Sequence, residues 1–192
     1  MRIEICGGIA SGKTTLAKLL EENMVGKVIY ENFRINPFWK AFYENPSKYT
    51  FETEIAFTLQ HYHEIKKNSD QDILITDYSF YLDLAYAKLG LQDKKLKIYL
   101  DLLEEIYNDI SSENLLIYLN CNSSIELSRI KRRNRDVEQN IEVGFLEMLN
   151  IELMEVIKNI DFIQIDSNEY DFANNLLDKE NVLNKIKKAL NK

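Results

Sequence analysis

The chain has 192 residues, of which 45% are hydrophobic and 29% are charged, and it contains six glycines and two prolines. This length suits one well-buried domain, and so few Gly and Pro residues predict regular elements with short connections. The formal charge of −7 argues against a nucleic-acid partner, because phosphate backbones require a net basic face.

The cysteines and the apolar runs predict a cytoplasmic protein. Cys6 and Cys121 each lie at the edge of an apolar run, and we expect two buried thiols rather than a disulfide or a metal pair. The residues after Met1 do not form a secretory signal, and no apolar run approaches the ~20 residues of a membrane span. We therefore expect a reducing cytoplasm and no membrane partner.

Short apolar runs alternate with longer amphipathic stretches along the chain. The runs predict five buried parallel strands, at residues 3–6, 27–31, 72–76, 115–120 and 162–165. The stretches predict helices at residues 14–23, 47–67, 96–110, 141–157 and 181–190. Two more helices are predicted from their caps, one after Asn36 with Pro37 in its first turn and one at the capping box of Ser123 and Glu126. The alternation predicts one α/β domain over residues 1–192, with helices on both faces of a parallel sheet.

The first predicted strand runs directly into a glycine-rich loop. Residues 7–14 match the phosphate-binding pattern G-x-x-x-x-G-K-[ST] between a strand and a helix, and we favour this function over a simple turn with a solvated lysine. Backbone N–H groups would surround a phosphate, Lys13 would reach the β- and γ-phosphates, and the Thr14 hydroxyl would bind magnesium. The residues expected to bind ATP at this loop are Gly7, Gly8, Ile9, Ala10, Ser11, Gly12, Lys13, Thr14 and Thr15.

An arginine-rich segment follows the fourth predicted strand. It contains five cations, Arg129, Lys131, Arg132, Arg133 and Arg135, in an otherwise acidic chain. Such runs are commonly solvated helix ends or nucleic-acid patches. In a chain with a phosphate loop the run instead predicts a mobile lid, at about residues 129–140, which neutralises charge on the transferred phosphoryl group. Arg133 and Arg135 are the best placed for this catalytic role, followed by Arg129.

Two acidic residues follow predicted strands. Glu31 ends the second strand and Asp77 follows the third, and the active crevice of an open parallel sheet lies at the carboxyl ends of its strands. One carboxylate could accept a proton from an attacking hydroxyl group and the other could hold magnesium. Either residue alone could equally cap the next helix.

In this order, the motifs resemble those of the deoxynucleoside kinases, in particular the bacterial deoxyadenosine/deoxyguanosine kinases. After Glu31, residues 36–46 match the segment N-P-[FY]-x-x-x-F-Y-E-[DN]-P of that family. Residues 77–83 match D-R-S-x-Y-x-D except at Tyr78, and residues 129–141 match the lid pattern R-I-K-x-R-x-R-x-x-E-Q-x-I. Residues 165–172 resemble the family's loop near the adenine of ATP, so the resemblance runs through nearly the whole chain.

The resemblance implies a P-loop kinase fold, which is a three-layer α/β/α arrangement around a five-stranded parallel sheet in the order 2-3-1-4-5. It also implies transfer of a phosphoryl group from ATP, with Mg2+, to the 5′-hydroxyl of a deoxynucleoside, as in nucleotide salvage. Asp171 and Phe172 would lie near the adenine. The family usually forms homodimers through long helices, which agrees with the two long amphipathic helices predicted here.

The resemblance also implies roles for individual residues. Glu31 would be the general base, and Asp77 would serve the magnesium. Tyr43 and Glu138 would hold the 3′-hydroxyl. Phe80 or a neighbouring aromatic side chain would stack on the base.

Two positions depart from the family pattern, and both are expected to touch the substrate. Glu54 stands where the family has a base-reading Gln, and an ionised Glu only accepts hydrogen bonds, which would suit the N1–H and N2–H donors of guanine or a cationic substrate. Tyr78 stands where the family has an Arg beside the catalytic Glu and the 5′-oxygen, which removes a positive charge from that place. Arg34, three residues after Glu31, is a candidate replacement for that charge.

These departures leave two alternatives to a purine deoxynucleoside kinase. One is a P-loop kinase of another small hydroxyl substrate, including a cationic one with Glu54 as its counter-charge. The other is a non-catalytic nucleotide-binding relative, which the change at Tyr78 motivates. His61 lies on the same predicted helix as Glu54, and a lone histidine there is expected to be structural or solvated, without a partner set for a metal.

Overall fold

The computed structural model of the chain describes residues 1–110 and 114–190, and a parallel sheet forms its centre. Five strands pair in the order β2-β3-β1-β4-β5, and every pairing is parallel. The strands are β1 (Arg2–Gly7), β2 (Lys27–Ile29), β3 (Leu74–Thr76), β4 (Asn114–Asn120) and β5 (Phe162–Asp166). The predicted strand number, direction and order are confirmed.

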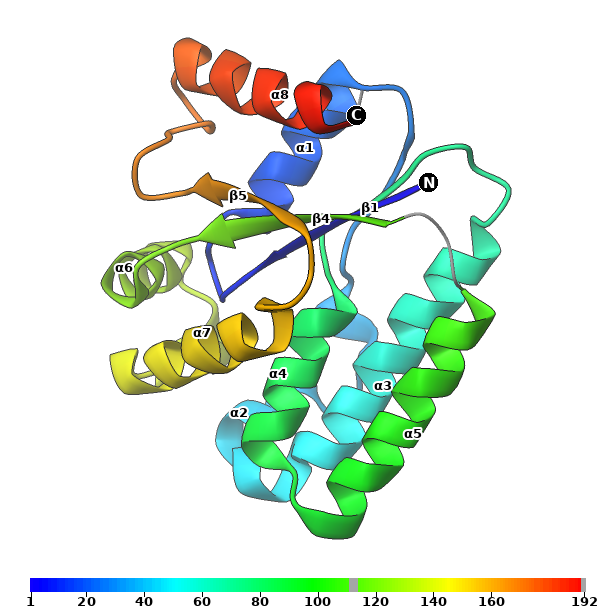
Figure 1. The fold of residues 1–192 in the computed structure, drawn as a ribbon. Helices are drawn as coiled ribbons and strands as arrows, with labels where there is room; N and C mark the ends of the chain where they lie inside the picture. The colour runs from blue at the N-terminus through cyan, green and yellow to red at the C-terminus, as the bar shows by residue number, and fades with distance from the viewer. Residues whose placement is uncertain (111–113, 191–192) are drawn as a thin grey trace.

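Helices cover both faces of this sheet (Figure 1). They are α1 (Lys13–Asn23), α2 (Trp39–Glu44), α3 (Pro46–Lys67), α4 (Phe80–Gly90), α5 (Asp93–Asp109), α6 (Ser123–Arg133), α7 (Val143–Ile157) and α8 (Leu176–Leu190). Helices α1 and α8 lie on one face, at the top of Figure 1, and α4 and α7 lie on the other with α3 and α5 beyond them. The predicted three-layer α/β/α architecture is therefore confirmed.

The core follows the apolar stripes of the helices. Leu16 and Leu20 of α1 and Ile186 of α8 pack on one face of the sheet, where each is fully buried. Leu149 and Leu153 of α7 do the same on the other face. Each such burial contributes about 1.5–3 kcal/mol, so both helix layers are anchored to the sheet.

Several elements differ in extent from their predictions. Strand β2 ends at Ile29, so Glu31 lies two residues beyond the strand rather than at its last residue. Helix α4, at Phe80–Gly90, has no counterpart among the predicted helices, because its residues are apolar almost all round and show no amphipathic period. Helix α8 begins at Leu176, five residues before the predicted start.

Both predicted helix caps take other roles. The side chain of Asn36 accepts the backbone N–H of Phe38, and α2 begins only at Trp39. Helix α6 begins at Ser123 itself, so Asn122 is the capping residue and no capping box forms. Glu126 is buried and accepts a hydrogen bond from Asn150 of α7 instead, because the packing of α7 on α6 encloses its carboxylate.

In the described part of the chain, no helix has both the length and the apolar character that crossing a bilayer requires.

Candidate active site

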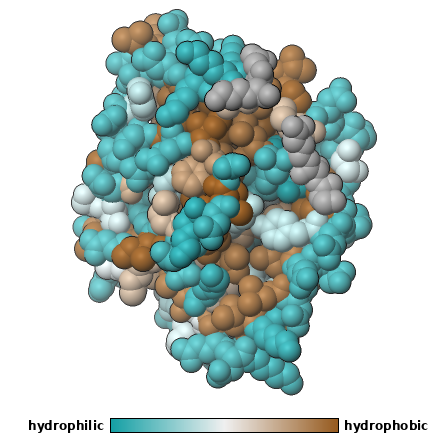
Figure 2. All heavy atoms as spheres, in the orientation of Figure 1, coloured by the Kyte–Doolittle hydropathy of each residue, from teal (hydrophilic) through white to brown (hydrophobic). Residues whose placement is uncertain are grey.

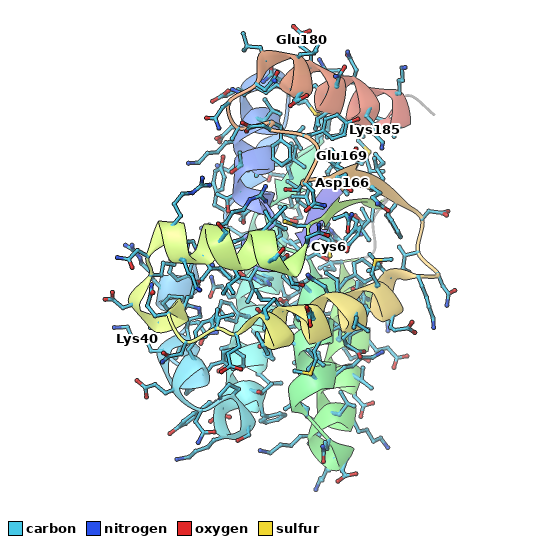
Figure 3. All side chains as sticks on the ribbon, turned by 90° about the vertical axis from the view of Figure 1, so that its left-hand side faces the viewer. Cys6, Lys40, Asp166, Glu169, Glu180 and Lys185 are labelled. Carbon is cyan, nitrogen blue, oxygen red and sulfur yellow. The ribbon has the colours of Figure 1, made fainter. Side chains whose placement is uncertain are left out.

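A cavity of about 1100 Å3 opens at the carboxyl ends of the strands. Figure 3 views the molecule from this side, with Cys6 near the end of β1 and Asp166 at the end of β5 close to the centre, and with α6 crossing the view. The walls come from the phosphate loop, the segments after β2 and β3, helices α2, α3 and α6, and the loop after β5. This is where the parallel sheet was expected to place the site.

The phosphate loop lies at one end of the cavity. Gly7, Ala10 and Gly12 have φ angles of 153°, 61° and 112°, and this backbone curls the chain into the first turn of α1. A Cβ atom on Gly12 would lie 3.1 Å from the Phe172 ring, so glycine also permits the close approach of the loop after β5. The Lys13 Nζ donates to the Gly7 and Gly8 carbonyl oxygens at 2.8 Å each, which holds the ammonium group within the loop.

Not every residue of the predicted ATP-binding loop faces the cavity. Those that line it are Ile9, Ala10, Gly12, Lys13, Thr14 and Thr15, joined at the same end by Asp171 and Phe172. Gly7, Gly8 and Ser11 instead form the backbone behind it, and Ser11 is fully buried.

Arg129 lines the cavity and binds the phosphate loop. Its guanidinium group donates to the carbonyl oxygens of Ala10 and Ser11 at 3.3 and 3.1 Å. It also donates to the Oγ and the carbonyl oxygen of Ser167, both at 2.8 Å, and the Ser167 hydroxyl in turn donates to the Ser11 carbonyl at 2.6 Å. Arg129 therefore connects α6, the phosphate loop and the loop after β5, although it was expected to act on the phosphoryl group.

Asp77 joins two other candidate residues. Its Oδ2 accepts the Thr14 hydroxyl at 2.9 Å, and its Oδ1 accepts the backbone N–H of Glu31. Burial raises the pKa of the Asp77 carboxyl, and the Glu31 N–H and the Thr14 hydroxyl oppose that rise. A hydroxyl and a carboxylate side by side are the oxygen ligands that Mg2+ prefers, so Thr14 and Asp77 fit the metal site expected of them.

The predicted lid forms a salt-bridged turn over the other end of the cavity. Helix α6 ends at Arg133, its C-cap residue Asn134 has a φ of 51° that turns the chain, and a 3₁₀ turn at Asp136–Glu138 follows. The buried Glu138 carboxylate accepts Arg133 at 2.6 and 2.7 Å and Arg135 at 3.2 Å. Arg135 also lies 4.2 Å from the centre of the Phe33 ring. These contacts hold both arginines at the mouth of the cavity.

The acceptor end of the cavity is lined by aromatic and acidic side chains. They include Trp39, Phe42, Tyr43, Glu54, Phe57, Tyr86 and Glu138. Burial and the nearby Glu138 raise the pKa of the Tyr43 phenol, which keeps its hydroxyl group neutral and able to donate. The structure thus brings Tyr43, Glu54 and Glu138 together with Glu31 in one cavity.

Burial opposes the ionised form of Glu54 that was expected from the sequence. Only 3% of the residue is exposed, and burial, followed by the charge of Asp83, raises the pKa of its carboxyl well above the ordinary value. The neutral acid is therefore favoured, and it offers one donor and one acceptor, as the amide of Gln does. Burial therefore weakens the argument from charge for a guanine base or a cationic substrate.

Tyr78 and Phe80 lie in the core and do not line the cavity, so neither can contact a substrate bound there. They are 3% and 0% exposed, they pack in the core between α3, α4 and α5, and neither lines the cavity. The chain turns after β3 so that both rings point into the protein. We therefore correct the expectation that these two residues bind substrate. Arg34 is exposed beside the Phe33 ring and does not line the cavity, so it does not replace the missing arginine.

His61 is the functional candidate that sequence reasoning missed. It is 1% exposed, its Nδ1 lies 2.8 Å from Oδ2 of Asp83, and its Nε2 lies 3.4 Å from Oε1 of Glu31. One signal was available, because Glu54 and His61 are seven residues apart on α3 and therefore share a face. The partner carboxylates come from other elements, and no local pattern indicates them.

The comparisons with known proteins agree with this arrangement. The family model described as deoxynucleoside kinase matches residues 3–191. The chain is 28% identical over 200 residues to a deoxyguanosine kinase of Bacillus subtilis, with 98% of this chain and 97% of that protein covered. It is 28% identical over 201 residues to a deoxyguanosine kinase of Lactobacillus acidophilus, with 96% and 88% covered.

Among solved structures, a deoxyadenosine kinase from M. mycoides has the same fold. Its TM-score is 0.83 at 24% identity, and the match covers 98% of this chain and 100% of that one. That structure is described as holding the products dCMP and a flexible dCDP. The phosphate loop, the strand-end carboxylates and the arginine-rich segment meet in one cavity, as such an enzyme requires. Because the family model matches almost the entire length, the chain belongs to the deoxynucleoside kinase family.

Proposed function

We propose that this protein transfers the γ-phosphoryl group of ATP to the 5′-hydroxyl of a purine deoxynucleoside. The observation that carries the proposal is the single cavity in which Glu31, the Thr14–Asp77 pair and the phosphate loop with Lys13 meet. The similarity to deoxyguanosine and deoxyadenosine kinases supports a purine acceptor.

Each candidate residue has a role in this reaction. Glu31 accepts the proton of the 5′-hydroxyl while its oxygen attacks the γ-phosphorus and the bond to the β,γ-bridging oxygen breaks, releasing ADP. Lys13 binds the β- and γ-phosphates, and Arg133 and Arg135 neutralise the charge on the transferred group. Thr14 and Asp77 would hold Mg2+, which would screen the phosphate charges.

The remaining candidates orient the two substrates. Tyr43 and Glu138 hold the 3′-hydroxyl of the deoxyribose, since both line the acceptor end of the cavity. Glu54 reads the base edge with one donor and one acceptor. Phe57 and the other aromatic rings around it take the stacking role that was first expected of Phe80. Asp171 and Phe172 lie at the adenine end of the ATP site.

We further propose that the chain acts as a cytoplasmic homodimer of single-domain subunits. Helix α7 exposes Met148, Ile151 and Met154, and the neighbouring α4 exposes Leu89. Figure 2 shows the molecule in the orientation of Figure 1, in which α4 and α7 face the viewer. Apolar side chains gather on this face among hydrophilic ones. Both cysteines are free and buried, as in a reducing compartment.

The test is ADP formation with ATP and magnesium across a panel of deoxyribonucleosides and ribonucleosides. We expect turnover with purine deoxynucleosides, and a loss of at least about 100-fold in kcat for Glu31→Gln, because the amide cannot accept the proton. Glu22→Gln, an exposed glutamate on α1, is the matched control and should keep full activity. An active Glu31→Gln enzyme, or no turnover of any nucleoside despite ATP binding, would refute the proposal.

A further inference from the structure

We infer that His61, held by Asp83, is a positioning residue that fixes Glu31 and supplies the positive charge beside it. The inference rests on the proposed role of Glu31 as general base and names a new part of the same site. It concerns a side chain from α3 that contacts Glu31 rather than the reacting atoms.

The geometry places one carboxylate at each nitrogen of the His61 ring. Asp83, in the first turn of α4, lies 2.8 Å from Nδ1, and Glu31, after β2, lies 3.4 Å from Nε2. Asp83 is 6% exposed, and Nε2 is buried without a hydrogen-bond partner, so its contact with Glu31 at 3.4 Å is an ion-pair contact. The imidazole thus lies between two carboxylates that both line the cavity, the buried Asp83 and the more exposed Glu31.

With both carboxylates ionised, this arrangement favours a proton on each ring nitrogen. A neutral imidazole has one N–H, so one of the two carboxylates would face a lone pair without water to separate them. Burial by itself would lower the pKa of His61, but the charges and hydrogen bonds of Asp83 and Glu31 outweigh burial and raise that pKa to about 10. Glu54 lies on the same face of α3 as His61 and also interacts with its charge. Because the neutral form of Glu54 is favoured, the anionic neighbours of His61 are Asp83 and Glu31.

The orientation of the ring is fixed by its aromatic neighbours. The Tyr78 ring stacks on the imidazole with centroids 3.9 Å apart and planes 10° apart, and the Tyr78 hydroxyl donates to the His61 carbonyl oxygen. The Phe57 ring lies 5.9 Å away at 28°. With the ring plane held in this way, Nε2 stays 3.4 Å from the Glu31 carboxylate and limits where that group can lie.

The same contacts explain why Tyr78 fits its position in this chain. An arginine there would place a second cation next to the His61 ring, whereas a tyrosine ring stacks on it. The positive charge beside Glu31 therefore comes from α3 instead of from the segment after β3.

The charge state of His61 can be measured without any turnover. The chain has two histidines, so NMR of the imidazole nitrogens, with His63→Gln to remove the other signal, reports His61 directly. We expect His61 to stay doubly protonated to at least about pH 8, well above the ordinary pKa of about 6.5. Asp83→Asn and Glu31→Gln should each move its deprotonation to lower pH. A singly protonated His61 at pH 7 would overturn the inference.

Kinetics of His61→Gln test the effect on Glu31. The Gln side chain keeps one donor but carries no charge, and we expect kcat to fall about 10²–10³-fold while KM for ATP stays within about threefold. Thermal unfolding of the variant separates this loss from misfolding, and His61→Asn is the second variant if Gln does not fold. An unchanged kcat in a folded His61 variant would overturn the inference. In that case an inactive Glu31→Gln enzyme would still support the proposed function. If the wild-type protein phosphorylated no nucleoside, the proposed function would fall, and the NMR titration would still decide whether His61 is the charged partner of Glu31.

Discussion

At the scale of single residues, Glu54 shows how burial changes the meaning of a side chain. In sequence it replaces a neutral amide with an acid, which suggests a change of substrate. In the cavity it is 3% exposed beside Asp83, and its raised pKa favours the neutral form. A protonated carboxyl group and an amide present the same pair of hydrogen-bonding functions to a base.

This equivalence predicts a pH-dependent difference between Glu54 and its amide. At about pH 6.5, Glu54→Gln should bind the preferred deoxynucleoside with a KM within about threefold of wild type. As the pH rises toward the raised pKa of Glu54, the wild-type carboxyl group ionises and loses its donor, so its KM should rise while that of the variant does not. Steady-state KM values at several pH points measure both effects. Equal pH dependence in the two proteins would contradict the prediction, since ionisation of the substrate would affect both alike.

At the scale of elements, α6 forms a bridge between the two ends of the active site. Its Arg129 binds the phosphate loop and the loop after β5, and its C-terminal end carries Arg133, which Glu138 holds. The same helix therefore contacts both the phosphate loop and the salt-bridged turn at its C-terminal end. In the arginine run that indicated a lid, Arg129 lines the cavity and also braces the phosphate loop, whereas Arg133 and Arg135 line the cavity and bind Glu138.

The bracing role predicts a specific effect of Arg129→Lys. A lysine keeps the charge but not the fork of donors that reaches several oxygens at once. We expect the variant to lose about 1–3 kcal/mol of unfolding free energy and to raise KM for ATP about tenfold, because the loop is no longer held. Denaturant unfolding and ATP kinetics measure the two effects. Lys131→Ala, on the exposed side of the same helix, should change neither, and an unaltered KM for ATP in Arg129→Lys would refute the bracing role.

At the scale of the whole molecule, the exposed apolar face of α4 and α7 predicts how two copies meet. Light scattering after size exclusion should give about twice the 22.6 kDa of one chain. Ile151 is 66% exposed on this face, and Ile151→Glu should weaken the dimer at least about 100-fold, because an unpaired charge would be buried in the contact. Val25→Glu, on the loop between α1 and β2, is the matched control and should remain a dimer. A monomeric wild-type protein would contradict the proposal.

The fold was predictable because its signals are local in the chain. The runs around Ile5 and Ile117 are short and apolar, and stretches long enough for helices separate such runs. This alternation predicts a parallel sheet without any knowledge of where each helix packs. The phosphate loop was equally readable, since Gly12, Lys13 and Thr14 act through backbone shape and adjacent side chains. Helix α4 escaped prediction because burial on nearly all sides removes the amphipathic period on which such predictions depend.

The sequence by itself therefore determined the phosphate loop and the alternation of strands and helices, because each depends on residues that are neighbours in the chain. The strand order and the family followed from a resemblance that several separate motifs carry together. Only the tertiary structure decided the chemistry around Glu31. The burial of Tyr78, the neutral form favoured at Glu54 and the contact of His61 with two carboxylates depend on which elements pack together. Removal of water from that contact sets the charge of each group, and this cannot be read from any one segment of the chain.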